Sequence, residues 1–148
     1  MFVNDPNNDV FSDVEKEDID QAVKNAEIES SCEFKVHVDP FCKEDTSKRS
    51  EDLFYKLEVD KTERHNGILF YAVLDCRKFI IKTDKDLEQT LPDGFWDDIY
   101  HVMLVNFRKG NYADGLSLAI QKAGEKLKPY YPWFKDDRNE VSDDLSIG

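Results

Sequence analysis

The first regular pattern along the chain is an apolar face with helical spacing, formed by Ile19, Ala22, Val23 and Ala26. Ser12 and Glu15 precede it as an S-x-x-E capping box, in which each side chain bonds an amide that would otherwise be unpaired at a helix start. These two signals predict a helix that begins at residue 12 and ends near residue 28.

Two segments have the patterns of β-strands. Residues 34–38 alternate apolar and polar side chains, which is typical of a strand with one buried face. Residues 68–74 are continuously apolar and too few for a buried helix, so they predict a central strand covered on both faces. A short helix near residues 50–58 would connect these strands and make them parallel.

The second half of the chain predicts a hairpin and two helices. A tight turn at residues 75–78 leads into an apolar segment at 79–81, which favours antiparallel pairing with the preceding strand. Apolar positions at helical spacing cover residues 95–107, and a second set follows Asn111, expected as a helix cap, until the prolines at 129 and 132. The chain is therefore expected to form an α/β domain with a mixed sheet.

The polar ends of the chain delimit this domain. Residues 1–11 are rich in Asn, Asp and Pro and predict an N-terminal arm, whereas residues 135–148 predict an acidic tail. The segment between them, residues 12–134, is long enough for one domain with its own core. Four aromatic residues lie near its end: Tyr130, Tyr131, Trp133 and Phe134. We expect them to fold back onto the core, because aromatic side chains bury large areas.

The charge of the chain excludes some partners. There are 32 acidic and 20 basic residues among 148, so this acidic protein has a formal net charge of −12. A surface of this sign repels nucleic acid and anionic lipid and attracts cations. We therefore expect no nucleic-acid partner, and a small phosphate-bearing substrate would need a metal ion or a local basic group to offset the repulsion.

Other features of composition bear on location. No stretch of 18 apolar residues occurs, which predicts no membrane insertion, and the first residues lack the pattern of an export signal. Cys32, Cys42 and Cys76 include no C-x-x-C pair, so the simplest interpretation is free thiols in a reducing compartment. Together these observations predict a cytoplasmic protein.

The densest group of carboxylates is Asp84, Asp86 and Glu88, followed by Asp93. Clusters of this kind suit a hard cation such as Ca²⁺, which prefers oxygen ligands. The D-x-D-x-E spacing is that of an EF-hand loop, but the sixth and twelfth positions lack the required glycine and glutamate. Two alternatives stay open: Asp93 suits a helix N-terminus, and the other three suit a solvated loop.

The predicted topology brings some of these side chains together. An antiparallel hairpin places Asp84, at the end of its second strand, beside Asn66, at the start of its first. Parallel pairing of the first two strands adds Glu33 to the same edge. We therefore predict a metal site of five side chains, with Ca²⁺ favoured over Mg²⁺: Glu33, Asn66, Asp84, Asp86 and Asp93.

A rival site lies at the opposite edge of the predicted sheet. Asp39 ends the first strand, and Asp75 and Arg77 lie in the hairpin turn. Arg77 is suited to bind a phosphate oxygen, although an aspartate and an arginine this close in a turn more often form an ion pair. The two catalytic candidates, Glu88 as a base and Arg77 as a phosphate ligand, are therefore predicted at opposite edges.

Several short motifs occur together between residues 64 and 132. Asn66-Gly67 precedes the apolar strand, Asp75-x-Arg77 lies in the hairpin, and Asp93 precedes a helix. The motif F-R-x-G-x-Y-x-x-G-L joins the last two helices, and residues 30–33 match an S-G-E entry into the first strand except for a cysteine in place of glycine. With these motifs, the chain resembles the TPM domain family.

The resemblance implies a mixed sheet sandwiched between helices, a three-layer α/β/α sandwich with roughly four strands. Members of the family are associated with calcium-dependent phosphatase activity on phosphate esters or nucleotides, and plant members with photosystem repair. Glu33, Asn66, Asp75, Arg77, Glu88 and Asp93 match positions of the family motif. Asp84 and Asp86 stand where one branch of the family has glycines, so this chain departs from that branch.

Two functions of different classes follow. In the first, a metal-dependent phosphatase, Asp84, Asp86 and Asp93 hold the ion and Glu88 accepts a proton from a bound water. In the second, a non-catalytic interaction module, the metal orders loops and the protein binds a partner in an assembly or repair process. The sequence contains no recognisable nucleophile or base dyad, which favours the second.

Overall fold

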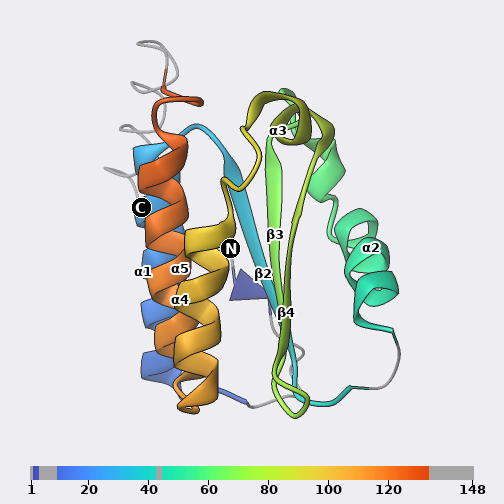
Figure 1. The fold of residues 1–148 in the computed structure, drawn as a ribbon, viewed down its shortest axis with the longest axis vertical. Helices are drawn as coiled ribbons and strands as arrows, with labels where there is room; N and C mark the ends of the chain where they lie inside the picture. The colour runs from blue at the N-terminus through green and yellow to red at the C-terminus, as the bar shows by residue number, and fades with distance from the viewer. Residues whose placement is uncertain (1, 4–9, 43–44, 134–148) are drawn as a thin grey trace.

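The computed structural model describes residues 2–3, 10–42 and 45–133. A mixed β-sheet with the strand order β1-β2-β3-β4 lies between helices (Figure 1). Three strands form its body, β2 (Glu33–Asp39), β3 (Gly67–Val73) and β4 (Lys78–Thr83), and β1 (Phe2–Val3) adds two residues at one edge. The predicted α/β class and mixed sheet are confirmed.

Strand pairing follows the predicted topology. β2 and β3 are parallel, with Glu33 opposite Gly67 and Asp39 opposite Val73. β3 and β4 form the antiparallel hairpin, in which Ile68 lies opposite Thr83. β3 is buried at all seven positions, as expected for a central strand whose two faces are both covered.

The two faces of the sheet are covered unequally (Figure 1). Three helices pack on one face: α1 (Asp13–Glu29), α4 (Asp97–Arg108) and α5 (Tyr112–Leu127). On the other face, α2 (Thr46–Lys56) and the 3-10 helix η1 (Val59–Lys61) bury a smaller cluster around Leu69 and Tyr71. α2 begins several residues before its expected start, because Asp45 Oδ1 accepts hydrogen bonds from two amides of its first turn.

Two close contacts require glycine. A Cβ atom on Gly67 would lie 2.2 Å from the carbonyl oxygen of Val59, so η1 rests directly on the start of β3. A Cβ atom on Gly124 would lie 2.6 Å from Ala26 Cα, which lets α1 and α5 approach closely. The glycine of the Asn66-Gly67 motif is therefore explained by packing.

The predicted helix caps and the predicted packing of the C-terminal aromatic residues are confirmed only in part. The capping box of α1 is present, with Ser12 and Glu15 bonded to each other's amides at 3.0 and 3.1 Å. Asn111 occupies the N-cap position of α5, but its side chain makes no capping hydrogen bond. Tyr131 folds back onto the core and is buried, whereas Tyr130 is exposed. Phe134 and the predicted tail, residues 135–148, lie outside the described residues, as does most of the predicted arm.

One alternative that the sequence left open, a solvated loop after Asp84, is excluded, and the prediction of three free thiols is wrong. Residues 85–90 form a helix, α3 (Lys85–Thr90), and not a loop, because Asp84 caps its first amide and Leu87 is buried against the core. Cys42 and Cys76 form a disulfide, with their Cα atoms 6.2 Å apart, and only Cys32 is a free thiol. The spacing of the cysteines gave no sign of this pair, because the fold brings their two loops together.

Candidate functional site

Four of the five predicted metal residues lie at one edge of the sheet, which we call the acidic edge: Glu33, Asn66, Asp84 and Asp86. Backbone hydrogen bonds connect the segments that carry them. The amide of Glu33 donates to Asn66 O at 3.3 Å, and the amide of Asp84 donates to Gly67 O at 3.0 Å. The amide of Asp86 donates to His65 O at 3.3 Å. The fold thus brings three of the predicted segments to this edge, whereas Asp93 lies outside it, in the turn between α3 and α4.

Several side chains at the acidic edge already have protein partners. Asp84 Oδ1 accepts from the Lys85 amide at 2.8 Å, and Oδ2 lies 3.2 Å from His65 Nδ1. Tyr131 donates its hydroxyl to Asp86 Oδ2 at 2.6 Å, and burial together with this bond raises the pKa of Tyr131. These contacts stabilise the start of α3 and the C-terminal segment, so both aspartates have structural roles.

The amide side chain of Asn66 is also engaged. Asn66 is 3% exposed, and its Nδ2 donates a 2.9 Å hydrogen bond to the carbonyl oxygen of Ser31. Its backbone amide donates to Thr62 Oγ1 at 3.0 Å. Asn66 therefore ties the segment before β3 to the segment before β2, and this explains its place in the motif.

The fit of a metal ion to the acidic edge is incomplete in this conformation. Glu33 and Asp93 are exposed and carry oxygen ligands suited to a hard cation. Among the described residues, however, no three carboxylates of the predicted set have ligand atoms within 4.8 Å of one another. A cation would have to draw Asp84 or Asp86 away from its present partner.

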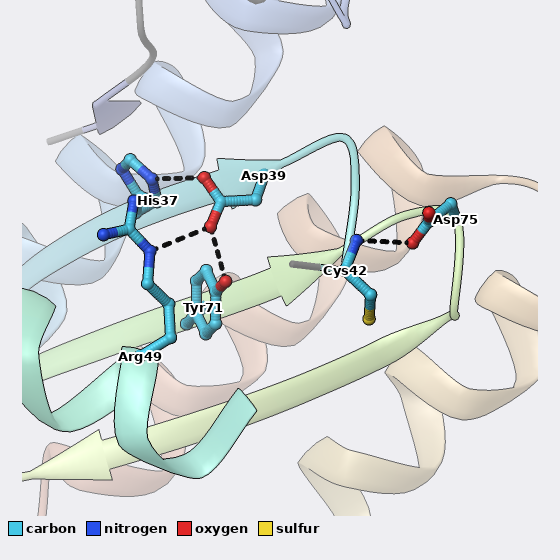
Figure 2. A network of polar contacts seen from close by, with 6 residues as sticks. All are labelled: His37, Asp39, Cys42, Arg49, Tyr71 and Asp75. Atoms are coloured by element: carbon cyan, nitrogen blue, oxygen red, sulfur yellow. Dashed lines mark hydrogen bonds and ion pairs between the residues drawn. The ribbon is translucent and has the colours of Figure 1, made fainter. Parts of the chain in front are cut away.

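The opposite edge, which we call the hairpin edge, contains a network around Asp39 (Figure 2). Asp39 Oδ1 lies 2.9 Å from His37 Nε2, and Oδ2 accepts hydrogen bonds from Tyr71 Oη at 2.5 Å and Arg49 Nε at 3.1 Å. The four side chains come from β2, β3 and α2. Asp39 therefore joins α2 to the sheet and is neutralised by Arg49.

The electrostatics of this network favour an ionised Asp39. Burial alone would raise the pKa of Asp39, but hydrogen bonds from His37, Tyr71 and Arg49 outweigh it and hold the pKa well below its usual range. Burial and the bond to Asp39 raise the pKa of Tyr71. A carboxylate with three protein partners is a poor metal ligand, so Asp39 has a structural role in this network and is not available to a metal ion.

The hairpin turn contains the other rival residues. Asp75 Oδ1 accepts a 2.9 Å hydrogen bond from the amide of Cys42, and the expected ion pair between Asp75 and Arg77 is absent from the described part of the chain. Arg77 is exposed and has a positive φ of 54°. It lines a cleft of about 500 Å³ between residues 45–47, at the start of α2, and residues 77–80.

The two catalytic candidates are far apart. Glu88 is exposed on α3, beyond the end of β4, and Arg77 lies in the turn before β4 begins. Six strand residues separate the two segments, which corresponds to about 20 Å at the rise of an extended strand. The fold does not bring Glu88 and Arg77 to one substrate.

The chain is similar to known proteins along most of its length. The family description of the TPM domain matches residues 3–126, which is most of the chain. The chain belongs to the TPM domain family. The search of curated proteins found no match.

Two solved structures resemble this TPM domain along most of its length. The NMR structure of the BA42 protein from the psychrophilic bacterium Bizionia argentinensis shares 34% identity with a TM-score of 0.82, covering 87% of this chain and 89% of that one. The N-terminal domain of a protein from P. gingivalis, also solved by NMR, shares 27% identity with a TM-score of 0.70. That match covers 88% of this chain and 83% of the other.

The sequence predicted Asp39, Asp75 and Arg77 at the hairpin edge of the TPM domain, but not the side chains that bond Asp39. His37 and Asp39 are two positions apart on one strand, which places them on the same face, and this spacing was available from the sequence. Tyr71 reaches Asp39 through the register of the parallel β2–β3 pair. Arg49 had no signal in the sequence, because only the packing of α2 against the sheet brings it to Asp39. Cys42 and Cys76 are likewise joined only by the fold.

Proposed function

We propose that this TPM domain binds a divalent cation at its acidic edge and acts as a metal-stabilised interaction module, without catalysis. The supporting observation is the meeting of Glu33, Asn66 and Asp84 from three segments tied by backbone hydrogen bonds. Sites that bind ligands are built by such convergence. Asp86 completes the ligands at this edge, and Asp93, in the turn between α3 and α4, would have to move toward the ion to join them. Ca²⁺ is the favoured ion and Mg²⁺ the alternative.

Cation binding would change the local contacts at this edge. The net charge of −12 favours a cation anywhere near the surface, and exposed Glu33 and Asp93 are available to it. Asp84 and Asp86 would exchange His65 and Tyr131 for the ion, so α3 and the C-terminal segment would respond to binding. A response of this kind could present or withdraw a surface for a protein partner in an assembly or repair process.

The separation of Glu88 from Arg77 argues against one hydrolytic site. A general base must lie within hydrogen-bond reach of the proton that it accepts, or reach it through one water. Arg77, about 20 Å away along β4, cannot bind the phosphate group of the same small substrate. The interaction module therefore accounts for the geometry better than the phosphatase does.

Hydrolysis of phosphate esters or nucleotides is the second candidate function, and the cleft at the hairpin edge favours it. Arg77 and Lys78 line this cleft beside the first turn of α2. Cationic side chains beside a helix N-terminus suit a phosphate group. Asp45 lines the same cleft and would repel the phosphate, which weakens the case.

The cytoplasmic location stays a prediction. The described residues contain no helix long and apolar enough to cross a membrane. The Cys42–Cys76 disulfide counts against a reducing compartment, because structural disulfides are typical of oxidising ones.

Calorimetric titration with Ca²⁺ and Mg²⁺ tests the proposed function. Glu33→Gln and Asp93→Asn each remove one charge from exposed predicted ligands, and Asp18→Asn, on exposed α1 surface, removes one charge elsewhere as the matched control. We expect saturable Ca²⁺ binding that weakens roughly tenfold in the first two variants and less than about twofold in the control. Equal weakening in all three variants would mean nonspecific attraction, and the proposal would fail.

A hydrolysis assay separates the two candidate functions. A chromogenic phosphomonoester and ATP are incubated with the protein in Ca²⁺, in Mg²⁺ or in chelator. The interaction module predicts no turnover above a heat-denatured sample under any condition. Metal-dependent turnover that is lost in Arg77→Asn would instead establish the phosphatase at the hairpin edge.

A further inference from the structure

The hairpin edge also brings two sulfur atoms and a carboxylate together. Among the described residues, one group of three or more metal-ligating side chains has ligand atoms within 4.8 Å of one another, and it is Cys42, Asp75 and Cys76. We propose that these residues form a second metal site, open only when the Cys42–Cys76 disulfide is reduced, which binds a thiophilic divalent ion such as Zn²⁺. This site is separate from the acidic edge and goes beyond the proposed function.

The geometry suits a tetrahedral ion once the disulfide is opened. Two thiolates on one Zn²⁺ lie about 3.8 Å apart, given tetrahedral coordination and Zn–S bonds of about 2.3 Å. The two Cα atoms are 6.2 Å apart, and small rotations of the two side chains can therefore separate the sulfurs by that amount. Asp75 supplies the third ligand, and water would fill a fourth position.

The scaffold of the site does not depend on the disulfide. The amide of Leu74 donates to Asp39 O at 3.0 Å and the amide of Asp75 donates to Pro40 O at 3.1 Å, extending the pairing of β2 and β3 into the two loops. The amide of Cys42 holds Asp75 Oδ1 at 2.9 Å. Three hydrogen bonds therefore keep both cysteines beside the carboxylate after reduction.

The site is also accessible to metal and reductant. Cys42 and Asp75 are exposed, and Cys76 is half-buried. The free thiol Cys32 contrasts with them, because it is buried and burial raises its pKa to about 12. Cys32 is therefore a poor ligand and a poor nucleophile, and only the hairpin pair is suited to this chemistry.

Opening the site is a thiol–disulfide exchange. A dithiol reductant transfers two electrons and two protons: the Cys42–Cys76 bond breaks, both cysteines become thiols, and the reductant closes its own disulfide. Zn²⁺ then displaces the two thiol protons as the sulfurs coordinate. Oxidation of the metal-free site by a disulfide of the same class reverses the sequence.

Reduction of the disulfide and binding of the metal ion would both affect the neighbouring cleft. The cleft lies between residues 45–47, which follow Cys42, and residues 77–80, which follow Cys76. Either the disulfide or the ion would tie these two walls together, whereas the reduced metal-free form would leave them joined by hydrogen bonds alone. Redox state and metal would therefore set the rigidity of the cleft.

Cobalt titration of the full chain tests the site, because Co²⁺ replaces Zn²⁺ and gives a near-ultraviolet charge-transfer band only with thiolate ligands. The protein is reduced under anaerobic conditions, separated from the reductant and titrated with CoCl₂. We expect a band that saturates at one ion per chain, disappears on adding one equivalent of ZnCl₂, and accompanies release of about two protons at pH 7. The oxidised chain should show no band.

Variants identify the ligands. Cys76→Ser should lose the band, Asp75→Asn should keep it with roughly tenfold weaker binding, and the control Cys32→Ala should behave as the parent chain. The midpoints of thermal unfolding of Cys76→Ser and of the reduced parent chain, both measured without metal, should agree. A lower midpoint for Cys76→Ser would show that this variant is misfolded. The proposal is overturned by a reduced chain without a band, or by a band that persists in folded Cys76→Ser. Ca²⁺ at the acidic edge gives no thiolate band, so the two metal proposals fail independently.

Discussion

The hydroxyl of Tyr71 donates a 2.5 Å hydrogen bond to Asp39 Oδ2 across the parallel pair of β2 and β3. Arg49, from α2, bonds the same oxygen, so one carboxylate joins two strands and the crossover helix. Tyr71 and His37 are 3% and 8% exposed, which leaves little access for a substrate. The network therefore stabilises the hairpin edge and does not form a catalytic dyad.

Asp39→Asn should destabilise the protein in a pH-dependent way. The folded pKa of Asp39 is lowered, so its carboxylate stabilises the fold above the unfolded pKa of about 3.9, and this contribution is lost as the pH falls below that value. We expect a loss of about 2 kcal/mol in the free energy of unfolding at pH 7, smaller than for a fully buried pair because the side chain is 16% exposed.

Urea unfolding at pH 7 and at about pH 3 measures the effect of Asp39→Asn. The difference from the parent chain should shrink at the lower pH, where the unfolded parent has bound a proton at Asp39. Asp18→Asn, which removes an exposed carboxylate, should show little difference at either pH. A difference for Asp39→Asn that is the same at both pH values would contradict the electrostatic explanation.

Gly67→Ala should be among the most damaging single substitutions in this domain. The added methyl group would lie 2.2 Å from Val59 O and 2.8 Å from Val59 Cγ1, so η1 or the start of β3 must move. Val59 and the start of β3 are buried, and we expect a loss of about 3 kcal/mol or more in the free energy of unfolding. Gly110→Ala is the matched comparison, because a Cβ atom at Gly110 would meet nothing within 4 Å. Only the positive φ of Gly110 disfavours alanine, and the free energy of unfolding should fall by about 1 kcal/mol.

The pattern of apolar residues was sufficient for most of the fold but not for the candidate site. Alternation in β2 and the continuous apolar run in β3 predicted these two strands, because burial on one or two faces determines the spacing of apolar residues. The expected crossover helix between them predicted their parallel pairing. α3 was missed because its six residues bury only Leu87 and so carry no periodic signal. Its capping aspartate was consequently interpreted as a metal ligand.

The disulfide and the full Asp39 network could not be predicted from the sequence, for a different reason. Cys42 and Cys76 are 34 residues apart, and nothing in that spacing specifies a pair. Their proximity depends on the parallel register of β2 and β3 continuing into two loops. Long-range contacts of polar side chains need this register, whereas hydrophobic patterns are local.

Substitutions at Asp84 separate its capping role from the proposed metal role. Asparagine can also cap a helix, so Asp84→Asn should keep most of the stability while removing a charged ligand. Asp84→Ala removes the bond to the Lys85 amide and the contact with His65, and should cost about 1–2 kcal/mol in the free energy of unfolding. Calorimetry and urea unfolding on both variants give the comparison.

The outcome for Asp84→Asn is informative in either direction. If stability is nearly unchanged and Ca²⁺ affinity falls roughly tenfold, the carboxylate serves both roles. If Ca²⁺ affinity matches that of the parent chain, Asp84 is only a cap and the proposed ligand set at the acidic edge loses its central member.

Arg77 occupies a backbone conformation that is unfavourable for any residue with a Cβ atom, so its substitution by glycine should stabilise the fold. At φ 54° it occupies the left-handed region, which costs a residue with a Cβ atom about 1–2 kcal/mol relative to glycine. Glycine in turn loses about 0.5–1 kcal/mol more backbone entropy on folding. Arg77→Gly should therefore raise the free energy of unfolding by about 0.5 kcal/mol, measured by thermal or urea unfolding, provided that the side chain contributes nothing else.

A companion pair of variants tests why an arginine is present at this strained position. Arg77→Asn tolerates the left-handed conformation without the charge, and Arg77→Lys keeps the charge without the planar guanidinium. If the cleft binds phosphate, inorganic phosphate should protect the parent chain against thermal unfolding, and this protection should disappear in Arg77→Asn and weaken in Arg77→Lys. Equal protection in all three proteins would show that Arg77 does not bind phosphate, and the phosphatase candidate at the hairpin edge would be excluded.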